Sequence, residues 1–294
     1  MKKRYLLFIP FALLLISAAM IFNRIDLRKA RSYNVCKTLN GDVLVYVIFV
    51  DTKTTAPWTE FDIETTRDSV AKAVQWLTDQ AVKNGVELNI KTDMFVGQEF
   101  TTIKRDLPEG SVRQSFTSPN TVKGTENLNK WADYIAKKAG TDFNITDKDG
   151  LPEIKNPRNK ERLIAWLRDE HKVESVALLL MVNNYFRDDI SVQMNTMSCD
   201  DVEFAVVSYK YPSGIAHNIL HLFGAADLHD SPFRKSDKNI NFALQEFPNE
   251  VMQNPYAKNV STLEINNFTK YLIGWCDTID QRYEPLFIEK GIRL

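Results

Sequence analysis

Residues 42–51 read DVLVYVIFVD, a nearly continuous run of apolar side chains, many of them β-branched. Such a run is typical of a strand that is buried on both faces of a sheet. Residues 59–83 follow, and their apolar side chains recur at helical spacing before Gly85, a residue type that commonly ends a helix. Residues 86–90 then alternate as in a half-buried strand. The order strand, helix, strand predicts an α/β layered architecture.

The same kinds of pattern continue toward the C-terminus. The further predicted strands are residues 175–182, SVALLLMV, and residues 202–209, VEFAVVSY. The further predicted helices are residues 125–139, 158–171 and 261–275. Ser261 or Thr262 would cap the last helix, because a hydroxyl oxygen accepts hydrogen bonds from the first turn. No loop is long enough to indicate a domain boundary, so we expect one domain over residues 32–294.

The composition excludes several classes of protein. The 294 residues include 37 Lys and Arg against 38 Asp and Glu, a net charge of -1, and 44% of them are hydrophobic. These fractions are those of a folded chain, and near-neutral charge argues against a nucleic-acid partner. The three cysteines, Cys36, Cys199 and Cys276, are too few and too scattered for a disulfide framework. They also lack the close spacing of a cysteine zinc cluster.

The N-terminus carries an uncharged segment, residues 5–22, which read YLLFIPFALLLISAAMIF after three basic residues. A segment of this length is about the shortest that can span a bilayer as a helix. Small residues at 17–19 would suit signal-peptide cleavage and secretion, whereas the bulky residues 20–22 favour retention. We therefore predict a single-pass membrane anchor with a basic connector over residues 1–31. The globular domain is expected outside the cytoplasm, and secretion after cleavage is the alternative.

Residues 213–230 read SGIAHNILHLFGAADLHD and contain three of the four histidines in the chain. His217 and His221 are four residues apart, so on a helix they project from one face and can share one cation. Gly224 can adopt a positive φ, end the helix and reverse the chain. That reversal can return Asp227 toward the two histidines. The segment therefore predicts a Zn²⁺ site.

This arrangement, H-x-x-x-H-x-x-G-x-x-D, resembles the motif H-E-x-x-H-x-x-G-x-x-H/D of the metzincin zinc metallopeptidases. The resemblance implies that His217 and His221 are helical zinc ligands, that Gly224 makes the turn and that Asp227 is the third ligand. It also implies that Met252 forms a methionine turn, an apolar floor beneath the metal. A metzincin-like domain would have a mixed sheet, a motif helix and a C-terminal helix.

Asn218 occupies the position at which the family has its catalytic Glu. In such enzymes the Glu takes a proton from the zinc-activated water and passes it to the leaving amine. An amide cannot act as that base, although it can hydrogen-bond to water. Loss of a general acid–base group lowers the rate by ~10²- to 10⁴-fold. The resemblance thus implies a zinc-binding protein with impaired peptidase activity, which binds peptide or protein partners in the cleft.

Three alternatives accompany this hypothesis. His229 lies two residues beyond Asp227 and is a rival third ligand. The second alternative is an active zinc metallopeptidase that uses a different general base. The candidate bases close in sequence are Glu246, Glu250, Asp230 and His229. The last alternative is a scaffold that binds no metal and serves only in interactions.

Overall fold

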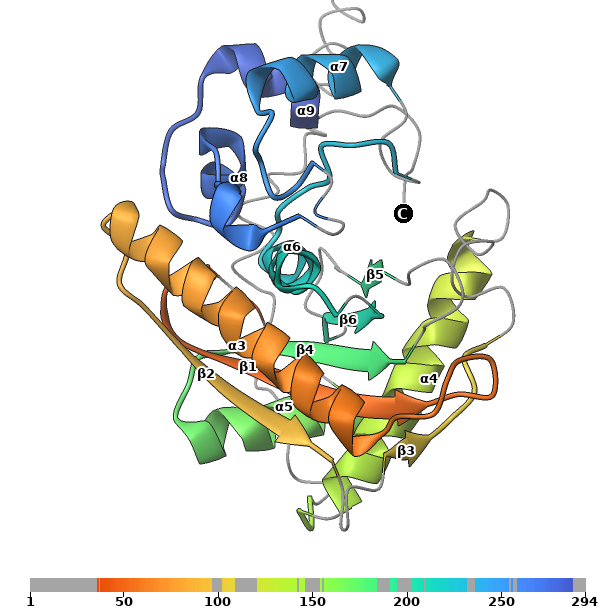
Figure 1. Cartoon of the computed structure of the whole chain (residues 1–294). Helices are drawn as coiled ribbons and strands as arrows, with labels where there is room; N and C mark the ends of the chain where they lie inside the picture. Colours follow the sequence, from red (N-terminus) through yellow and green to blue (C-terminus); the bar gives the residue numbers. More distant parts are fainter. Residues whose placement is uncertain are drawn as a thin grey trace, which may run out of the picture.

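The computed structural model describes residues 36, 38–96, 102–108, 121–141, 143–145, 154, 156–183, 191–194, 202–208, 210–231, 236–253, 255 and 258–287. Within these ranges one sheet has the strand order β2-β1-β4-β6-β5, and a short strand, β3, pairs with the end of β1 (Figure 1). The strands are β1 (Gly41–Asp51), β2 (Leu88–Phe95), β3 (Ile103–Lys104), β4 (Ser175–Val182), β5 (Ser191–Met194) and β6 (Phe204–Val207). The strands expected at residues 42–51 and 175–182 are confirmed.

The sheet is mixed, as expected. Strands β2, β1, β4 and β6 run parallel, and the edge strand β5 runs antiparallel to β6. Strand β1 lies between two parallel neighbours, with Val45 opposite Thr92 of β2 and Ala177 of β4. Residues 43–50 of β1 are therefore hydrogen-bonded along both edges and buried on both faces, which explains their continuous apolar sequence.

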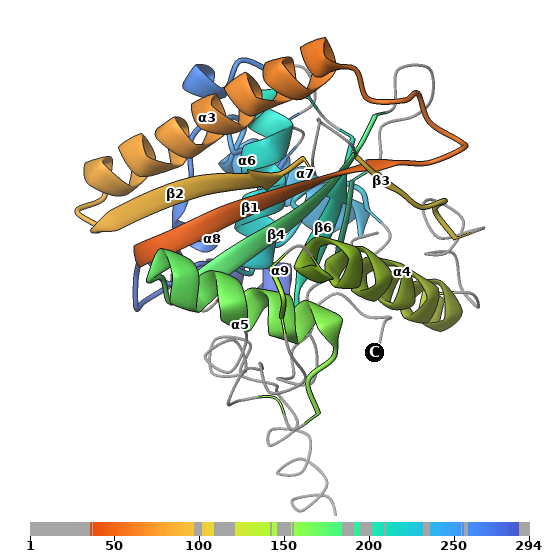
Figure 2. The same ribbon diagram turned by 90° about the horizontal axis from the view of Figure 1, so that it is seen from below.

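Helices cover both faces of the sheet, which gives three layers (Figures 1 and 2). The helices α3 (Glu60–Lys83) and α6 (Pro212–Leu222) pack on one face, and α4 (Thr121–Thr141) and α5 (Asn159–His171) pack on the other. Successive β1 side chains alternate between the two cores. Val43, Val45, Val47 and Phe49 join the first core, whereas Leu44, Tyr46, Ile48 and Val50 join the second. The predicted α/β layered architecture is confirmed.

The C-terminal part packs on the side of α6 that faces away from the sheet (Figure 1). Its elements are α7 (Asp237–Glu246), η2 (Val260–Thr262), α8 (Asn267–Leu272), η3 (Gln281–Tyr283) and α9 (Glu284–Phe287). The expected helix over residues 261–275 is wrong in extent, because only α8 is α-helical there. Asn266 Oδ1 accepts hydrogen bonds from the N–H groups of Phe268 and Thr269, at 2.8 and 3.1 Å, and so begins the helix late.

The predicted membrane segment and basic connector, residues 1–31, lie outside the described residues, as does Cys199. Among the residues that are described, no helix has both the length and the apolar character needed to cross a membrane. Cys36 and Cys276 are both thiols, and the buried Cys36 Sγ donates to the carbonyl oxygen of Val176 at 3.0 Å.

Candidate metal centre

The predicted motif helix is α6, and it is enclosed on every side. Pro212 stands in its first turn, where the missing N–H breaks no helical hydrogen bond. Every residue from Ser213 to Leu222 is buried, because the sheet lies on one side of the helix and the C-terminal elements lie on the other. His217 and His221 are only 4% and 3% exposed. Two buried imidazoles require partners for their nitrogens.

Gly224 makes the predicted turn. Its φ is +97°, a value that side chains disfavour. The N–H of Gly224 donates to His221 O at 2.8 Å, and the N–H of Ala225 donates to Leu220 O at 3.0 Å. This pair of bonds is a Schellman motif, which ends the helix and turns the chain back. The turn also brings Ala225 O to 2.8 Å from Nδ1 of His221.

Three side chains converge just beyond this turn. His221 Nε2 lies 2.9 Å from His217 Nε2 and 2.9 Å from Asp227 Oδ1. His217 Nε2 lies 3.3 Å from the same carboxylate oxygen. The structure therefore brings together the three residues that the sequence singled out, as a group whose ligand atoms could hold one metal ion.

Backbone carbonyls orient both rings. His217 Nδ1 lies 3.0 Å from Val251 O, and His221 Nδ1 lies 2.8 Å from Ala225 O. A carbonyl oxygen can only accept, so each Nδ1 carries the proton and donates it. In the neutral rings both Nε2 atoms are then unprotonated, and their lone pairs face one another and a carboxylate. Histidine metal ligands usually have this arrangement, in which Nδ1–H donates to a carbonyl and Nε2 points toward the ion.

The spacing of the three atoms fits zinc. Histidine nitrogens and carboxylate oxygens lie at ~2.0–2.2 Å from Zn²⁺ in a tetrahedral arrangement, so neighbouring ligand atoms are about 3.3 Å apart. The three separations here are 2.9, 2.9 and 3.3 Å. Two nitrogens and one oxygen are also donors that zinc accepts. Three protein ligands would leave the fourth position for a small molecule, as in catalytic zinc sites.

The charges in the cluster favour a cation. Burial tends to raise the pKa of Asp227, but without a metal the positive charge and hydrogen bonds of protonated imidazoles, that of His221 first, hold that pKa well below its usual value. The carboxylate is therefore ionised. Burial lowers the pKa of His217, and the neighbouring His221 lowers it further, so protonation of His217 is disfavoured. The cluster thus pairs a buried carboxylate with an imidazole that resists protonation.

His229, the rival ligand, is also close. Its Nε2 lies 3.2 Å from Asp227 Oδ1, and its Nδ1 lies 2.8 Å from Asp230 O. Its side chain is 35% exposed, compared with 11% for Asp227. Burial acts to lower the pKa of His229, but the hydrogen bond to Asp227 and that carboxylate's charge raise it overall. His229 therefore borders the cluster on its open side.

Met252 lies in the turn that follows α7, and its side chain is fully buried in the same core as α6. The backbone of this turn contacts both sides of the cluster. Val251 O accepts from His217 Nδ1, and Met252 O accepts from the N–H of Leu228 at 2.9 Å. The turn therefore orients one predicted ligand and holds the segment that carries Asp227.

Asn218, between the two histidines, is completely buried. Its Nδ2 donates to Gly214 O, one turn earlier in α6, at 2.8 Å. Two of the alternative bases have partners elsewhere. Glu246 accepts from Arg282 and Tyr283, and Glu250 accepts from the backbone N–H of Asn266 and the hydroxyl of Thr269.

No residue type marks in advance the two carbonyls that orient the imidazoles. Val251 and Ala225 act through backbone oxygens, which every residue possesses, so only the fold identifies them. Gly224, by contrast, marked the turn through its residue type. A comparison of the chain with protein-family models and with curated proteins gives no match.

Proposed function

We propose that this chain is a membrane-anchored, metzincin-like zinc-binding protein with impaired peptidase activity, which binds peptide or protein partners near the metal. One observation carries the proposal: His217 and His221 turn their Nε2 atoms toward Asp227 while carbonyls occupy both Nδ1 atoms. A metal ion at this point would accept a lone pair from each Nε2 atom and balance the Asp227 carboxylate.

The order of elements supports the metzincin-like part of the proposal. A buried motif helix, α6, is followed by the Gly224 turn, then by the turn that contains Met252, and then by helix α8. That is the order which the motif resemblance implies. The mixed sheet beneath α6 agrees with it as well.

The chain's own residues would divide the work as follows. His217, His221 and Asp227 hold the ion, and Val251 and Ala225 fix the two imidazole rings. Zn²⁺, when bound, supplies a Lewis acid. A hydrolytic reaction also needs a residue to accept a proton from water, and the Asn218 amide cannot do so. Zinc binding and catalysis therefore separate in this chain.

The second candidate function is an active zinc metallopeptidase in which His229 is the base. Its imidazole borders the cluster at 3.2 Å from Asp227 and is partly exposed. Glu246 and Glu250 are less suited to the role, because their carboxylates are bonded to groups away from the cluster.

A cleavage assay distinguishes the two functions. The full chain, purified in mild detergent and supplied with zinc, is incubated with a mixed peptide library. We expect no chelator-sensitive cleavage above that of the His217→Ala variant. Robust cleavage that chelation and His217→Ala abolish, and that His229→Ala also abolishes, would replace the proposal with the second candidate.

Membrane anchoring by residues 5–22 rests on the sequence alone. We expect the full chain, expressed in a bacterium, to fractionate with membranes, to resist carbonate extraction and to keep a mass near 33.8 kDa. A soluble product shortened by about twenty residues would instead indicate a cleaved signal peptide and secretion.

A further inference from the structure

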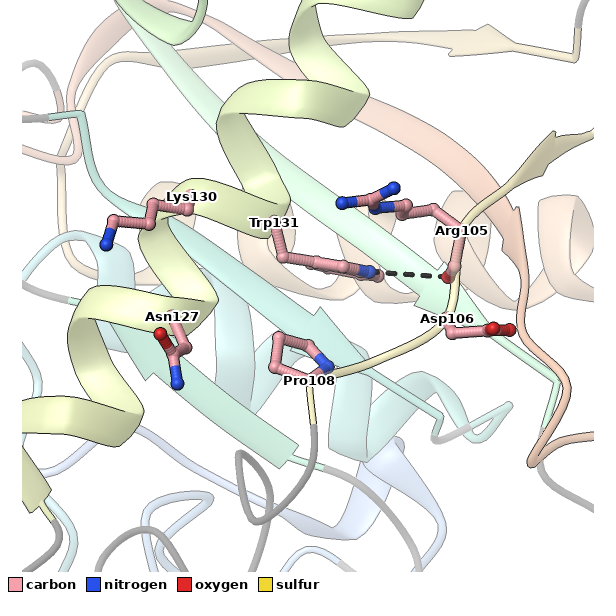
Figure 3. Close-up of a pocket in the computed structure, with 6 residues that line it drawn as sticks. All are labelled: Arg105, Asp106, Pro108, Asn127, Lys130 and Trp131. Carbon is pink, nitrogen blue, oxygen red and sulfur yellow. Dashed lines mark hydrogen bonds between the residues drawn. The ribbon is translucent and has the colours of Figure 1, made fainter.

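A second site candidate lies on the opposite side of the sheet from the metal centre. A hollow of about 380 Å³ opens between the segment after β3 and helix α4 (Figure 3). The described residues that line it are Arg105, Asp106, Pro108, Asn127, Lys130 and Trp131. Helix α4 packs on the second core, whereas α6 and its histidines pack on the first. The hollow is therefore separate from the predicted zinc site.

Arg105 is held in place at three points. Its N–H donates to Asp51 O at 2.9 Å, and its carbonyl accepts from Trp131 Nε1 at 3.3 Å. Its guanidinium lies 4.3 Å from the centre of the Tyr134 ring, a favourable cation–π contact. A guanidinium in such a contact can still donate from its N–H groups to a carboxylate. The backbone of Arg105 is thus fixed at two points, and the Tyr134 contact restrains its exposed side chain.

The positive charge at the hollow is not balanced from within. Asp106 is the carboxylate among the lining residues, and Figure 3 shows it directed away from the Arg105 guanidinium. Its Oδ1 accepts from the N–H of Lys53 at 2.8 Å, and its Oδ2 lies 3.0 Å from Lys53 Nζ. The backbone and side chain of Lys53 lower the pKa of Asp106 most, and the charge of Arg105 adds a smaller decrease, so Asp106 is paired mainly with Lys53. Across the described ranges, neither Arg105 nor Lys130 has an ion-pair partner.

We propose that this hollow binds an acidic peptide segment. The Arg105 guanidinium and the Lys130 ammonium supply the positive charge that can bind one or two carboxylates. The Asn127 amide can form a hydrogen bond with a peptide group. Pro108 supplies an apolar contact for the peptide's methylene groups, whereas Trp131 is almost fully buried. Two cations beside an Asp106 carboxylate are too few for a nucleic-acid backbone, which presents a dense row of phosphates. A volume of about 380 Å³ suits a few side chains.

Fluorescence anisotropy on the full chain in mild detergent tests the proposal. The probe is a labelled peptide rich in Asp and Glu, compared with a peptide of the same length rich in Lys and with a single-stranded oligonucleotide. We expect the acidic peptide to bind best, and its affinity to fall as salt is added. Equal binding of the basic peptide would overturn the proposal. Tighter binding of the oligonucleotide would replace it with a nucleic-acid site.

Variants locate the binding. Arg105→Gln and Lys130→Gln should each lower the affinity for the acidic peptide by about tenfold. The double variant should reduce binding to background. Lys138→Gln is the matched control, because Lys138 also lies over the Tyr134 ring, at 5.8 Å, without lining the hollow. The site would be refuted if Lys130→Gln, at an exposed position, and the double variant both bound the acidic peptide as tightly as the natural chain does.

Discussion

His217 Nε2 and His221 Nε2 lie 2.9 Å apart, although both rings already use Nδ1 to donate to a backbone carbonyl. Two neutral imidazoles in these tautomers have no hydrogen to share between the facing nitrogens. A positive charge between them removes the repulsion and also balances the Asp227 carboxylate. The proposed metal ion would supply that charge while both Nε2 atoms stay unprotonated. We therefore expect bound metal to stabilise the fold.

Removal of the metal should destabilise the protein. A ligand that binds only the native state adds about 2.7 kcal/mol to the unfolding free energy at a concentration of 100 times its Kd. We expect the zinc-loaded chain to unfold at a higher temperature in calorimetry than the chelated chain. The His217→Ala/His221→Ala double variant should unfold at one temperature with or without zinc. An identical midpoint for the loaded and chelated natural protein would count against a native zinc site.

Asp227 should contribute more to zinc affinity than His229 does. Its Oδ1 lies 2.9 and 3.3 Å from the two Nε2 atoms and its side chain is 11% exposed, whereas His229 is 35% exposed. Competition titration against a zinc chelator should show a larger loss of affinity for Asp227→Ala than for His229→Ala. Equal losses, or a larger loss for His229→Ala, would transfer the role of third ligand to His229.

Asn218→Glu should introduce the missing proton acceptor. The substitution restores the sequence H-E-x-x-H, and a carboxylate at that position can act as a general base, worth ~10²- to 10⁴-fold in rate. We expect zinc-dependent hydrolysis of a peptide library to rise above that of the natural chain. Asn218→Gln is the matched control, because it lengthens the side chain without adding a base. A rise of the same size in the control would refute the role assigned to position 218.

Glu250 should make stability fall as the pH rises. Burial raises its pKa from 4.5 to about 8, and the nearby Glu264 adds to the increase, while hydrogen bonds from Asn266 and Thr269 oppose it. The native state thus keeps a proton that the unfolded chain releases above about pH 4.5. The stabilisation from this group is complete below that pH and is lost as the pH rises toward 8. Each pKa unit of difference corresponds to about 1.4 kcal/mol.

Denaturant unfolding between pH 5 and pH 8.5 measures this effect, on the order of a few kcal/mol. The unfolding free energy of the natural chain minus that of Glu250→Gln should decrease over this range, because Gln cannot titrate. Glu87→Gln, at an exposed position, is the matched control for the replacement of a Glu by Gln. A constant difference for Glu250→Gln would show that Glu250 ionises normally in the folded protein.

Much of the architecture was predictable because its signals are local. The continuous apolar run of β1 and the all-buried β4 could be placed only inside a sheet. Helix α3 was marked by its apolar spacing, and it begins after Thr59, whose side chain accepts from the N–H of Asp62 at 3.2 Å. Gly224 marked the turn after α6, since few other residues adopt a φ of +97°.

The features that sequence reasoning missed depend on contacts between distant segments. Strand β5 is four residues long and exists through its pairing with β6. The late start of α8 follows from the bridge between Glu264 and Glu250, which holds residue 264 outside the helix. The carbonyl of Val251 meets His217 across 34 positions of sequence. None of these pairings leaves a pattern in the residues themselves.

Zinc content tests most directly whether His217, His221 and Asp227 hold a metal ion. The full chain is purified in mild detergent, loaded with zinc, passed through a desalting column and analysed for metal and protein on the same sample. We expect about one zinc per chain for the natural protein and none for the His217→Ala/His221→Ala variant. A natural protein that retains no zinc, or a double variant that retains a full equivalent, would contradict it.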